Sequence, residues 1–429
     1  MSFQDECFRY HSDGRKGKIE IVPSKPCSTQ KHLSMAYTPG VAEICRAIAA
    51  NPEAVYDYTA RGNLVAVVTN GTAVLGLGNI GPLAAKPVME GKSVLFKLFA
   101  DVDAFDICLD ANNPRQVIEC VQALAPTFGG INLEDIKAPE CFHIEQELIE
   151  SLGIPVLHDD QHGTAVVLGA ALINAMYLAG KKPSELKVVI SGAGAAGIAG
   201  AKFLISLGIP AQNIYMFDSV GLIHQGREGL SASKQQFMQE KDLSLAEAMK
   251  GADCFIGCSV RDIINQDMVR KMADNPIIFA CANPDPEIPY PEAKAARPDA
   301  IVATGRSDFP NQVNNVLGFP FLFRAALDCK AERFTEGMKI AAAKAVALLA
   351  RTAPAPEVLK AYGLTGREFG AESLLPLPFD PRLAEIVPPA VVKAAVHDGV
   401  AQKHLDLAAY PNELRKRMAD LKQRLNRII

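Results

Sequence analysis

Two acidic clusters precede a glycine-rich turn in this chain, and that order indicates which chemistry it can support. The clusters are Leu133–Ile136 (LEDI) and His158–Thr164 (HDDQHGT), and the turn is Gly192–Gly197 (GAGAAG). Carboxylates are hard oxygen ligands for a divalent cation. A G-x-G-x-x-G turn is typical of a dinucleotide phosphate site. Together they predict metal-assisted redox chemistry on a small anionic substrate.

The expected metal ligands are Glu134, Asp135 and Asp160. Adjacent side chains diverge in a regular helix or strand, but at an irregular strand end Glu134 and Asp135 can turn toward one ion. Asp160 would complete a set of carboxylates suited to Mg²⁺ or Mn²⁺, with open positions for substrate and water. The spacing alone leaves an alternative open, in which Asp159 or Asp160 only caps the helix that follows.

Two other spacings resemble those of zinc ligands but lack the rest of a zinc site. His158 and His162 lie four residues apart, yet no H-E-x-x-H is present. Cys254 and Cys258 form a C-x3-C with no second pair. The 10 cysteines show no disulfide framework, so we expect reduced thiols and no zinc.

The glycine-rich turn has the context that a dinucleotide site requires. It follows the expected strand Lys187–Ile190 and opens the expected helix Ala195–Leu207. The first glycine makes the tight turn, the second admits the pyrophosphate, and the third lets helix and strand pack closely. An ordinary glycine-rich βα turn is the alternative. The expected dinucleotide-binding residues are Gly192, Gly194, Ala195, Ala196 and Gly197, with Asp218 at the next strand end to accept the ribose 2′-hydroxyl.

A second glycine-rich stretch, Gly71–Gly81 (GTAVLGLGNIG), has two interpretations. We favour a tight β-turn-β element, with Ala73–Leu77 as a buried strand, that shapes the substrate pocket. A competing nucleotide site is the alternative.

The elements that must position these residues form two successive α/β patterns. In the first part, Thr38-Pro39 opens a helix over Gly40–Ala50. Both acidic clusters follow strand-like segments, and open α/β sheets bind ligands at the ends of strands. The other segments expected there are strands Leu64–Thr69, Ala104–Leu109 and Ile154–Leu157 and a helix over Pro82–Phe99.

The second part reads as βαβ units followed by helices. Its further expected strands are Asn213–Phe217, Cys254–Cys258, Ile277–Ala282 and Ala300–Thr304, and its long helix is Phe334–Arg351. Apolar runs without alternation suit a parallel sheet covered on both faces. The predicted fold is α/β, with an N-terminal substrate and metal domain (1–160), a Rossmann-like dinucleotide-binding domain (161–382) and a C-terminal helical appendage (383–429).

Composition excludes several classes of protein. With 429 residues, 49% hydrophobic and 21% charged, the chain suits two globular domains. A net charge of −4 offers no basic face for nucleic acid. The apolar segment Ala165–Gly180 is shorter than the roughly 20 residues that a bilayer needs, so we expect a helix buried between two domains and no membrane segment. Met1–Glu20 shows no secretory signal, which favours a cytoplasmic location.

Taken together, these segments closely resemble the malic enzyme family, in particular its short bacterial form. The resemblance spans nearly the whole chain in order. The matching segments are Tyr37–Val41 (YTPGV), Val74–Asn79 (VLGLGN), Met89–Lys92 (MEGK), Glu134-Asp135, HDDQHGTA, GAGAAG, Ala282–Pro284 (ANP), Gln312–Asn315 (QVNN) and Pro376–Pro381 (PLPFDP).

The resemblance implies roles for residues that their types alone do not rank. Tyr37 matches the family's general acid and Lys92 its general base, and burial would lower the pKa of Lys92 toward neutrality, as a base requires. Asp159 matches the carboxylate that supports Lys92. The remaining matches are the metal ligands Glu134, Asp135 and Asp160 and the substrate-carboxylate positions Asn283, Asn314 and Asn315.

The implied function is oxidative decarboxylation of (S)-malate to pyruvate and CO₂ by a homodimer, with NADP or NAD and with Mg²⁺ or Mn²⁺. Asp218 nominally favours NAD, whereas Ser219 and Arg227 leave NADP open. Ala73 stands near the place where the long forms of the family have a substrate-binding arginine. Which residue of this chain binds the corresponding substrate carboxylate is therefore open. The alternatives are a metal-independent dehydrogenase of the amino-acid dehydrogenase type and a non-catalytic dinucleotide sensor.

Overall fold

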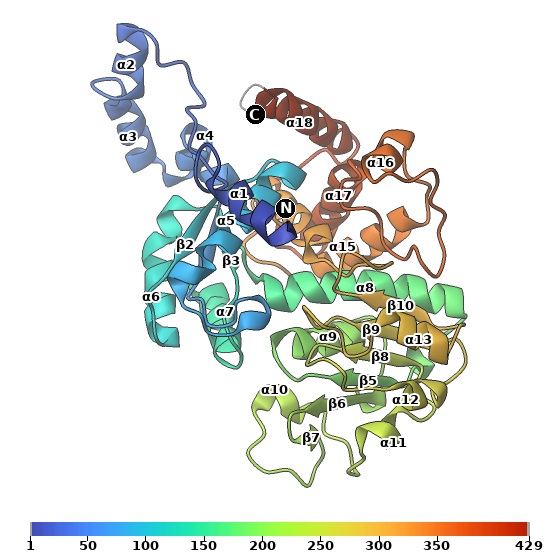
Figure 1. The fold of residues 1–429 in the computed structure, drawn as a ribbon. Coiled ribbons are helices and arrows are strands. Elements are labelled where there is room, and N and C mark those ends of the chain that lie inside the picture. The colour runs from blue at the N-terminus through green and yellow to red at the C-terminus, as the bar shows by residue number, and fades with distance from the viewer. Residues whose placement is uncertain (1, 427–429) are drawn as a thin grey trace.

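The structure, a computed structural model, describes residues 2–426 of the chain. A four-stranded and a six-stranded sheet are each covered by helices and follow one another along the chain (Figure 1). C-terminal helices complete the molecule. This architecture confirms the expected α/β class and the order of its parts, while the domain boundaries at residues 160 and 382 stay predictions.

The N-terminal sheet places the two acidic clusters at neighbouring strand ends. Its strands are β1 (Leu64–Thr69), β2 (Asp103–Cys108), β3 (Gly130–Leu133) and β4 (Val156–His158). All are parallel, in the order β2-β1-β3-β4. Because β3 and β4 are paired, the residues that directly follow them meet at one edge of the sheet.

The side chains of β1 alternate between two cores. Val65 and Val67 pack on the α5 side, and Ala66 and Val68 pack on the side of α6 and α7. Both faces are therefore covered, every residue of β1 is buried, and the continuous apolar run of this strand is explained. The helices are α5 (Pro82–Ala100), α6 (Pro114–Leu124) and α7 (Glu140–Ser151).

The second sheet has the topology of a dinucleotide-binding fold. Its strands are β5 (Val188–Ser191), β6 (Ile214–Asp218), β7 (Gly221–Leu222), β8 (Cys254–Gly257), β9 (Ile277–Ala280) and β10 (Ile301–Thr304), in the order β10-β9-β8-β5-β6-β7. Only the short β6–β7 pair is antiparallel. The chain proceeds from β5 outward on one side and then returns to β8 on the other, and open α/β sheets bind ligands in a crevice beyond the carboxyl ends of two such strands.

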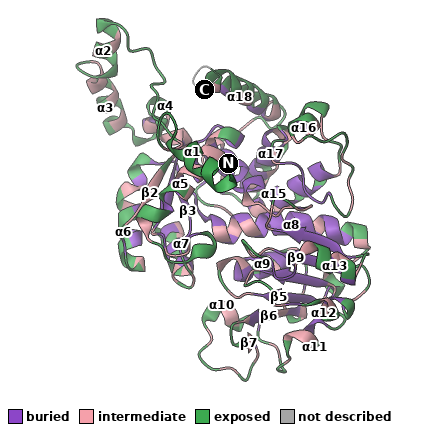
Figure 2. Ribbon diagram, in the orientation of Figure 1, coloured by how far each residue is buried: buried purple, intermediate pink, exposed green. Residues whose placement is uncertain are grey.

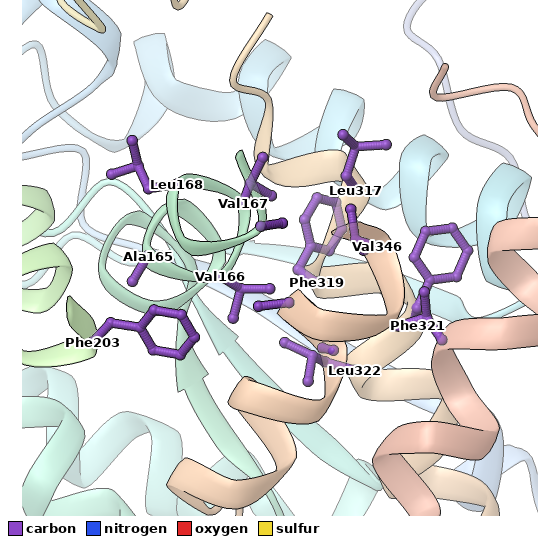
Figure 3. Close-up of a cluster of buried hydrophobic side chains, with 14 of the residues drawn as sticks. Ala165, Val166, Val167, Leu168, Phe203, Leu317, Phe319, Phe321, Leu322 and Val346 are labelled. Atoms are coloured by element: carbon purple, nitrogen blue, oxygen red, sulfur yellow. The ribbon is translucent and has the colours of Figure 1, made fainter. Parts of the chain in front are cut away.

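Helix α8 (Asp159–Ala179) lies between the two sheets and belongs to the core (Figure 1). Its 21 residues are long and apolar enough to cross a membrane, yet 67% of its most apolar window is buried inside the protein. It packs against α9 (Ala195–Ser206) and α15 (Glu336–Ala350). Figure 3 shows Val166 and Val167 of α8 among Phe203, Phe319 and Val346. The expected buried helix is confirmed, although it begins six residues earlier than the apolar segment.

The C-terminal helices pack into the same core. Helix α17 contacts α14 and α15, and its Val387 and Val391 are fully buried. Helix α18 is anchored where Tyr410 donates to Asp328 at 2.7 Å and Arg424 contacts Asp101 at 2.7 Å. These helices are α14 (Phe319–Asp328), α16 (Pro356–Ala361), α17 (Arg382–His397) and α18 (Tyr410–Leu425).

The first three helices are exposed, and the second and third form a projecting arm (Figure 1). None of the residues of α1 (Phe3–Ser12), α2 (Gln30–Ala36) or α3 (Val41–Ala50) is buried. The α2–α3 hairpin projects away from both sheets (Figures 1 and 2). Apolar side chains on this hairpin, such as Leu33 and Met35, are more than half exposed, which is typical of a surface that packs against another molecule.

Two local predictions were wrong. Ala73–Leu77 is not a strand: Val74 bridges to Gly78 around a 3₁₀ turn, and Leu75 and Leu77 are exposed. Gly71, Gly78 and Gly81 have φ of +68°, +75° and +82°, and these bends leave no room for an extended run. Helix α3 begins at Val41 with Gly40 as its N-cap, without a side-chain cap from Thr38.

The remaining elements are short connections. They are α4 (Val55–Tyr58), α10 (Ala232–Gln235), α11 (Leu245–Met249), α12 (Gln266–Arg270), α13 (Tyr290–Ala296) and the 3₁₀ turns Pro52–Ala54, Ala60–Asn63, Leu75–Leu77, Ala125–Thr127, Pro183–Glu185, Ala211–Asn213 and Asn315–Leu317.

Candidate active site

Glu134, Asp135 and Asp160 come together beyond β3 and β4. One ligand oxygen from each lies within 4.8 Å of the others, and no other group of this kind occurs among residues 2–426. Glu134 and Asp135 directly follow β3, and Asp160 lies in the first turn of α8. The Asp135 amide donates to Asp160 Oδ2 at 2.8 Å. The two acidic clusters therefore form one site.

This carboxylate site fits a divalent cation. Asp135 has a φ of +53°, an unusual conformation for a residue with a side chain, and its Oδ2 is buried without a hydrogen-bond partner. Burial, together with the neighbouring carboxylates, raises the pKa of Glu134, Asp135 and Asp160. A cation would remove this mutual repulsion, and oxygen ligands suit Mg²⁺ or Mn²⁺.

The capping alternative for the second acidic cluster is wrong. The N-cap of α8 is His158, and no side chain caps this helix end. Asp159 and Asp160 occupy the first turn, where negative charge also interacts favourably with the helix dipole. Their side chains instead face Lys92 and the metal-ligand cluster.

Lys92 joins the metal-ligand cluster to α8. It lies on α5 and is only 7% exposed. Its Nζ lies 2.7 Å from Asp159 Oδ2 and 3.0 Å from Glu134 Oε1. The Phe319 ring packs beneath the ammonium, 4.4 Å from Nζ to the ring centroid. The lysine is thus held between two carboxylates and one aromatic face.

The protonation of Lys92 differs from expectation. Burial does favour the neutral amine, but the charges of Asp159 and Glu134 outweigh it and raise the pKa of Lys92 above its ordinary value. Burial therefore does not set the protonation of Lys92 by itself, and the sequence does not show that the side chain meets two carboxylates.

Glu145 supports this arrangement from behind, and sequence reasoning missed it. The buried carboxylate, on α7, accepts from the His158 backbone amide at 2.7 Å and from the Gln161 side chain at 3.0 Å. It also contacts His162 Nε2 at 3.0 Å. The other ring nitrogen of His162 contacts Lys339. Glu145 therefore holds the start of α8. Both ring nitrogens of His162 are engaged, one with Glu145 and the other with Lys339. No spacing in the sequence pairs Glu145 with this segment.

Tyr37 is not brought to this site by its own chain. It follows α2 on the exposed arm and is 71% exposed. The hairpin that carries it points away from both sheets (Figure 1). Its expected role as general acid therefore needs an arrangement that one chain does not provide.

The three asparagines expected at the substrate lie in different environments. Asn315 donates to Asp159, so it is part of the Lys92 environment. Asn314 accepts from the Val316 amide at 3.0 Å and caps the turn after it. Asn283 follows β9 and is oriented by a weak contact, at 3.4 Å, to the Cys281 carbonyl. Their roles toward substrate stay predictions.

The GAGAAG turn connects β5 to α9 as its motif requires. Gly192 has a φ of +109°, and a Cβ on it would lie 2.3 Å from the Cys258 carbonyl oxygen. A Cβ on Gly197 would lie 1.8 Å from the Gly192 oxygen, whereas one on Gly194 would meet nothing within 4 Å. The first and third glycines are therefore required for packing, and the open space beside Gly194 is available for a ligand.

Asp218 ends β6 but is not free to bind a ribose. Arg227 holds both of its oxygens, at 2.9 and 3.0 Å, and Lys234 contacts Oδ2 at 2.7 Å. Burial alone would raise the pKa of Asp218, but these partners keep that pKa well below its usual range. Two cations face one carboxylate, so this corner of the crevice has a net positive charge.

Comparison with known proteins decides the family. Residues 16–117 match the family profile "Malic enzyme, N-terminal domain", and residues 161–359 match "Malic enzyme, NAD binding domain". An NADP-dependent malic enzyme of Halomonas elongata is 52% identical over 92% of this chain and 94% of its own. The chain belongs to the malic enzyme family. The crystal structure of malic enzyme from Pyrococcus horikoshii Ot3 superposes with a TM-score of 0.92 at 40% identity, covering 100% of this chain and 98% of that one.

Some members of the malic enzyme family are much longer than this chain. An NADP-dependent malic enzyme of Rhizobium meliloti is 53% identical over 99% of this chain but only 56% of its own length. The chain thus spans about half the length of several of the curated relatives it matches. Gly192–Gly197 and Asp218 lie within the residues that match the NAD-binding domain.

The dinucleotide turn allows a paired test. Gly194→Val should abolish most dinucleotide binding with little change in thermal stability, because its side chain enters open space that the pyrophosphate needs. Gly197→Ala should instead lower the melting temperature, because its Cβ meets backbone. Dinucleotide titration and thermal unfolding of both variants check this expectation. Normal binding by Gly194→Val would place the pyrophosphate elsewhere.

Proposed function

We propose that this chain catalyses the oxidative decarboxylation of (S)-malate to pyruvate and CO₂, with reduction of a nicotinamide dinucleotide. The observation that carries the proposal is the position of Lys92, which contacts both a predicted metal ligand, Glu134, and the α8 carboxylate Asp159. A metal-independent dehydrogenase would not need Glu134, Asp135 and Asp160 in one cluster. A non-catalytic sensor would not need a buried lysine beside them.

In this proposal Lys92 takes the hydroxyl proton of malate as hydride leaves C2. A bound dinucleotide would supply the hydride acceptor, and Glu134, Asp135 and Asp160 would hold a divalent cation that would polarise the C2 oxygen. Lys92 must first be neutral. If Glu134 were a metal ligand, its charge would be shared with the cation, and the pKa of Lys92 would fall toward the range that a base needs. Asp159 then keeps the amine in place.

We further propose that the enzyme is a homodimer in which Tyr37 reaches the site of the other subunit. Proton delivery to C3 needs a general acid, and Tyr37 is the residue that the family resemblance assigns to this step. It is 71% exposed on an arm with apolar, uncovered side chains. A second copy that packs on the arm would cover Leu33 and Met35 and bring Tyr37 to a substrate.

For the cofactor we propose a preference for NADP over NAD. A free Asp218 would repel a 2′-phosphate, but Arg227 and Lys234 already neutralise it. The remaining positive charge suits a phosphate. Relatives named for either cofactor are about equally similar, such as an NADP-dependent malic enzyme of Halomonas elongata at 52% identity and an NAD-dependent one of Rhizobium meliloti at 53%, so the proposal rests on the charges around Asp218.

The substrates would be small molecules, with no nucleic acid or membrane partner, and we propose a cytoplasmic location. All 10 cysteines are free, which suits a reducing compartment.

The central test supplies (S)-malate, Mn²⁺ and NADP and measures pyruvate and NADPH. We expect equal amounts of both products. Asp160→Asn should weaken Mn²⁺ binding and lower turnover, because one charged oxygen ligand is lost, while dinucleotide titration stays normal. Asp110→Asn, on an exposed loop position, is the control. Product formation without any divalent cation would contradict the assignment of the carboxylate cluster.

Subunit mixing tests the role of Tyr37. Tyr37→Phe should slow pyruvate formation roughly 10²–10⁴-fold, as expected for a lost general acid, and Lys92→Ala should stop malate oxidation. If Tyr37 acts across the dimer, each mixed dimer has one intact site, so an equal mixture after subunit exchange should recover about one quarter of the parent activity. If Tyr37 acts within its own subunit, both sites of each mixed dimer carry one defect and no activity returns.

Cofactor preference is tested by removing one charge. Lys234→Ala should raise the KM for NADP roughly 10–100-fold, the effect of losing one charge-assisted contact, and should leave the KM for NAD nearly unchanged. Lys241→Ala, an exposed lysine nearby in sequence, is the matched control. Equal effects of Lys234→Ala on both dinucleotides would remove the 2′-phosphate from this corner.

A further inference from the structure

Glu287 is a fully buried carboxylate that the proposed reaction does not use. Its side chain is 0% exposed. Oε1 accepts from the Ser259 backbone amide at 2.8 Å, and Oε2 accepts from the Ala282 backbone amide at 3.0 Å. Ser259 lies in the loop after β8, and Ala282 lies in the loop after β9. One side chain therefore joins two loops at the same edge of the sheet.

The charge of Glu287 has no counterion in its surroundings. Within residues 2–426, no lysine, arginine or histidine nitrogen lies within 4.0 Å of its carboxylate. Burial raises its pKa, and the backbone donors only partly oppose this. A buried charge held without a counterion is costly, which suggests that its partner is a group that binds at this edge.

The position of Glu287 indicates which part of a bound dinucleotide would lie nearest to its carboxylate. Asp218 and its two cations lie at the end of β6, on one side of the crevice beside β5. With the adenosine half on that side, the nicotinamide half extends over β8 and β9, on the other side. The two loops held by Glu287 are the ends of these strands.

Both loops also contact groups already assigned to the site. Ser259 Oγ lies 2.9 Å from Ser191 Oγ, at the end of β5 directly before the GAGAAG turn. Ala282 precedes Asn283, a predicted substrate residue. A Cβ on Gly257, the last residue of β8, would lie 2.2 Å from the Glu287 carboxyl carbon. Glu287 is thus packed directly against the end of β8, and glycine is needed there to make room for it.

We propose that Glu287 is a positioning residue beneath the nicotinamide half of the dinucleotide, and that its charge favours the oxidised form of the cofactor. It fixes the loops of Ser259 and Asn283 relative to each other. The oxidised nicotinamide ring carries a positive charge and the reduced ring carries none, so a nearby buried carboxylate stabilises the first and not the second. This inference rests on the proposed function, because it assumes a redox-active dinucleotide in this crevice.

The test compares the binding of oxidised and reduced cofactor without catalysis. NADPH binding is followed by its fluorescence, and NADP⁺ binding is measured by displacement of NADPH. Glu287→Gln keeps the shape of the side chain but removes its charge. We expect the Kd for NADP⁺ to rise roughly tenfold more than the Kd for NADPH, as for a lost charge interaction across a partly screened distance. A purely structural role would raise both values by the same factor.

Two further variants separate charge from geometry. Glu287→Asp keeps the charge but shortens the side chain, so both Kd values should rise together with their ratio unchanged. Glu292→Gln removes an exposed charge on α13 and should alter neither value. If Glu287→Gln does not fold, Glu287→Met, which also removes the charge at a similar side-chain length, takes its place: a larger rise of the NADP⁺ Kd than of the NADPH Kd supports the proposal, and an equal rise of both overturns it.

The outcomes also separate this inference from the proposed function. If the parent protein binds neither NADP(H) nor NAD(H), the proposed function is wrong. If the parent binds both NADP⁺ and NADPH and the ratio of the two Kd values is the same in Glu287→Gln, only the role of Glu287 is overturned.

Discussion

The contacts of Lys92 with Asp159 and Glu134 are the interaction on which the rest of the site depends. Three buried carboxyl groups and the partly exposed Asp160 are gathered around one buried ammonium. Such a set of charges is unfavourable unless its geometry is held from outside. The fold does this by taking Lys92 from α5, Glu134 from the end of β3 and Asp159 from α8.

Helix α8 connects this charged site to the rest of the molecule. Its first turn carries two of the carboxylates, and its apolar body packs between the two sheets (Figure 1). Glu145 holds the segment before it through the His158 amide. Because the helix is buried along most of its length, its N-terminal end cannot shift without disturbing the core. Rigid packing thus fixes the distances at which the charged groups meet.

Buried charges also lie at both ends of the proposed dinucleotide site, and their net signs are opposite. Asp218 is surrounded by cations at one end, so its own charge is more than balanced. Glu287 has only backbone amides at the other end. In the binding mode proposed above, positive charge would lie beside the phosphate and buried negative charge would lie beneath the oxidised ring.

The sequence by itself determined the α/β class, the order of the elements and the grouping of the acidic clusters at strand ends, because these follow from local hydrophobic periodicity and short motifs. It did not determine the conformation of Leu75–Leu77, where glycines with positive φ override an apolar run. Tertiary structure alone decided that Lys92 meets two carboxylates, that Asp218 is already paired and that Tyr37 is exposed. The physical reason is range: burial and electrostatic environment depend on residues far apart in the chain, which no local pattern specifies.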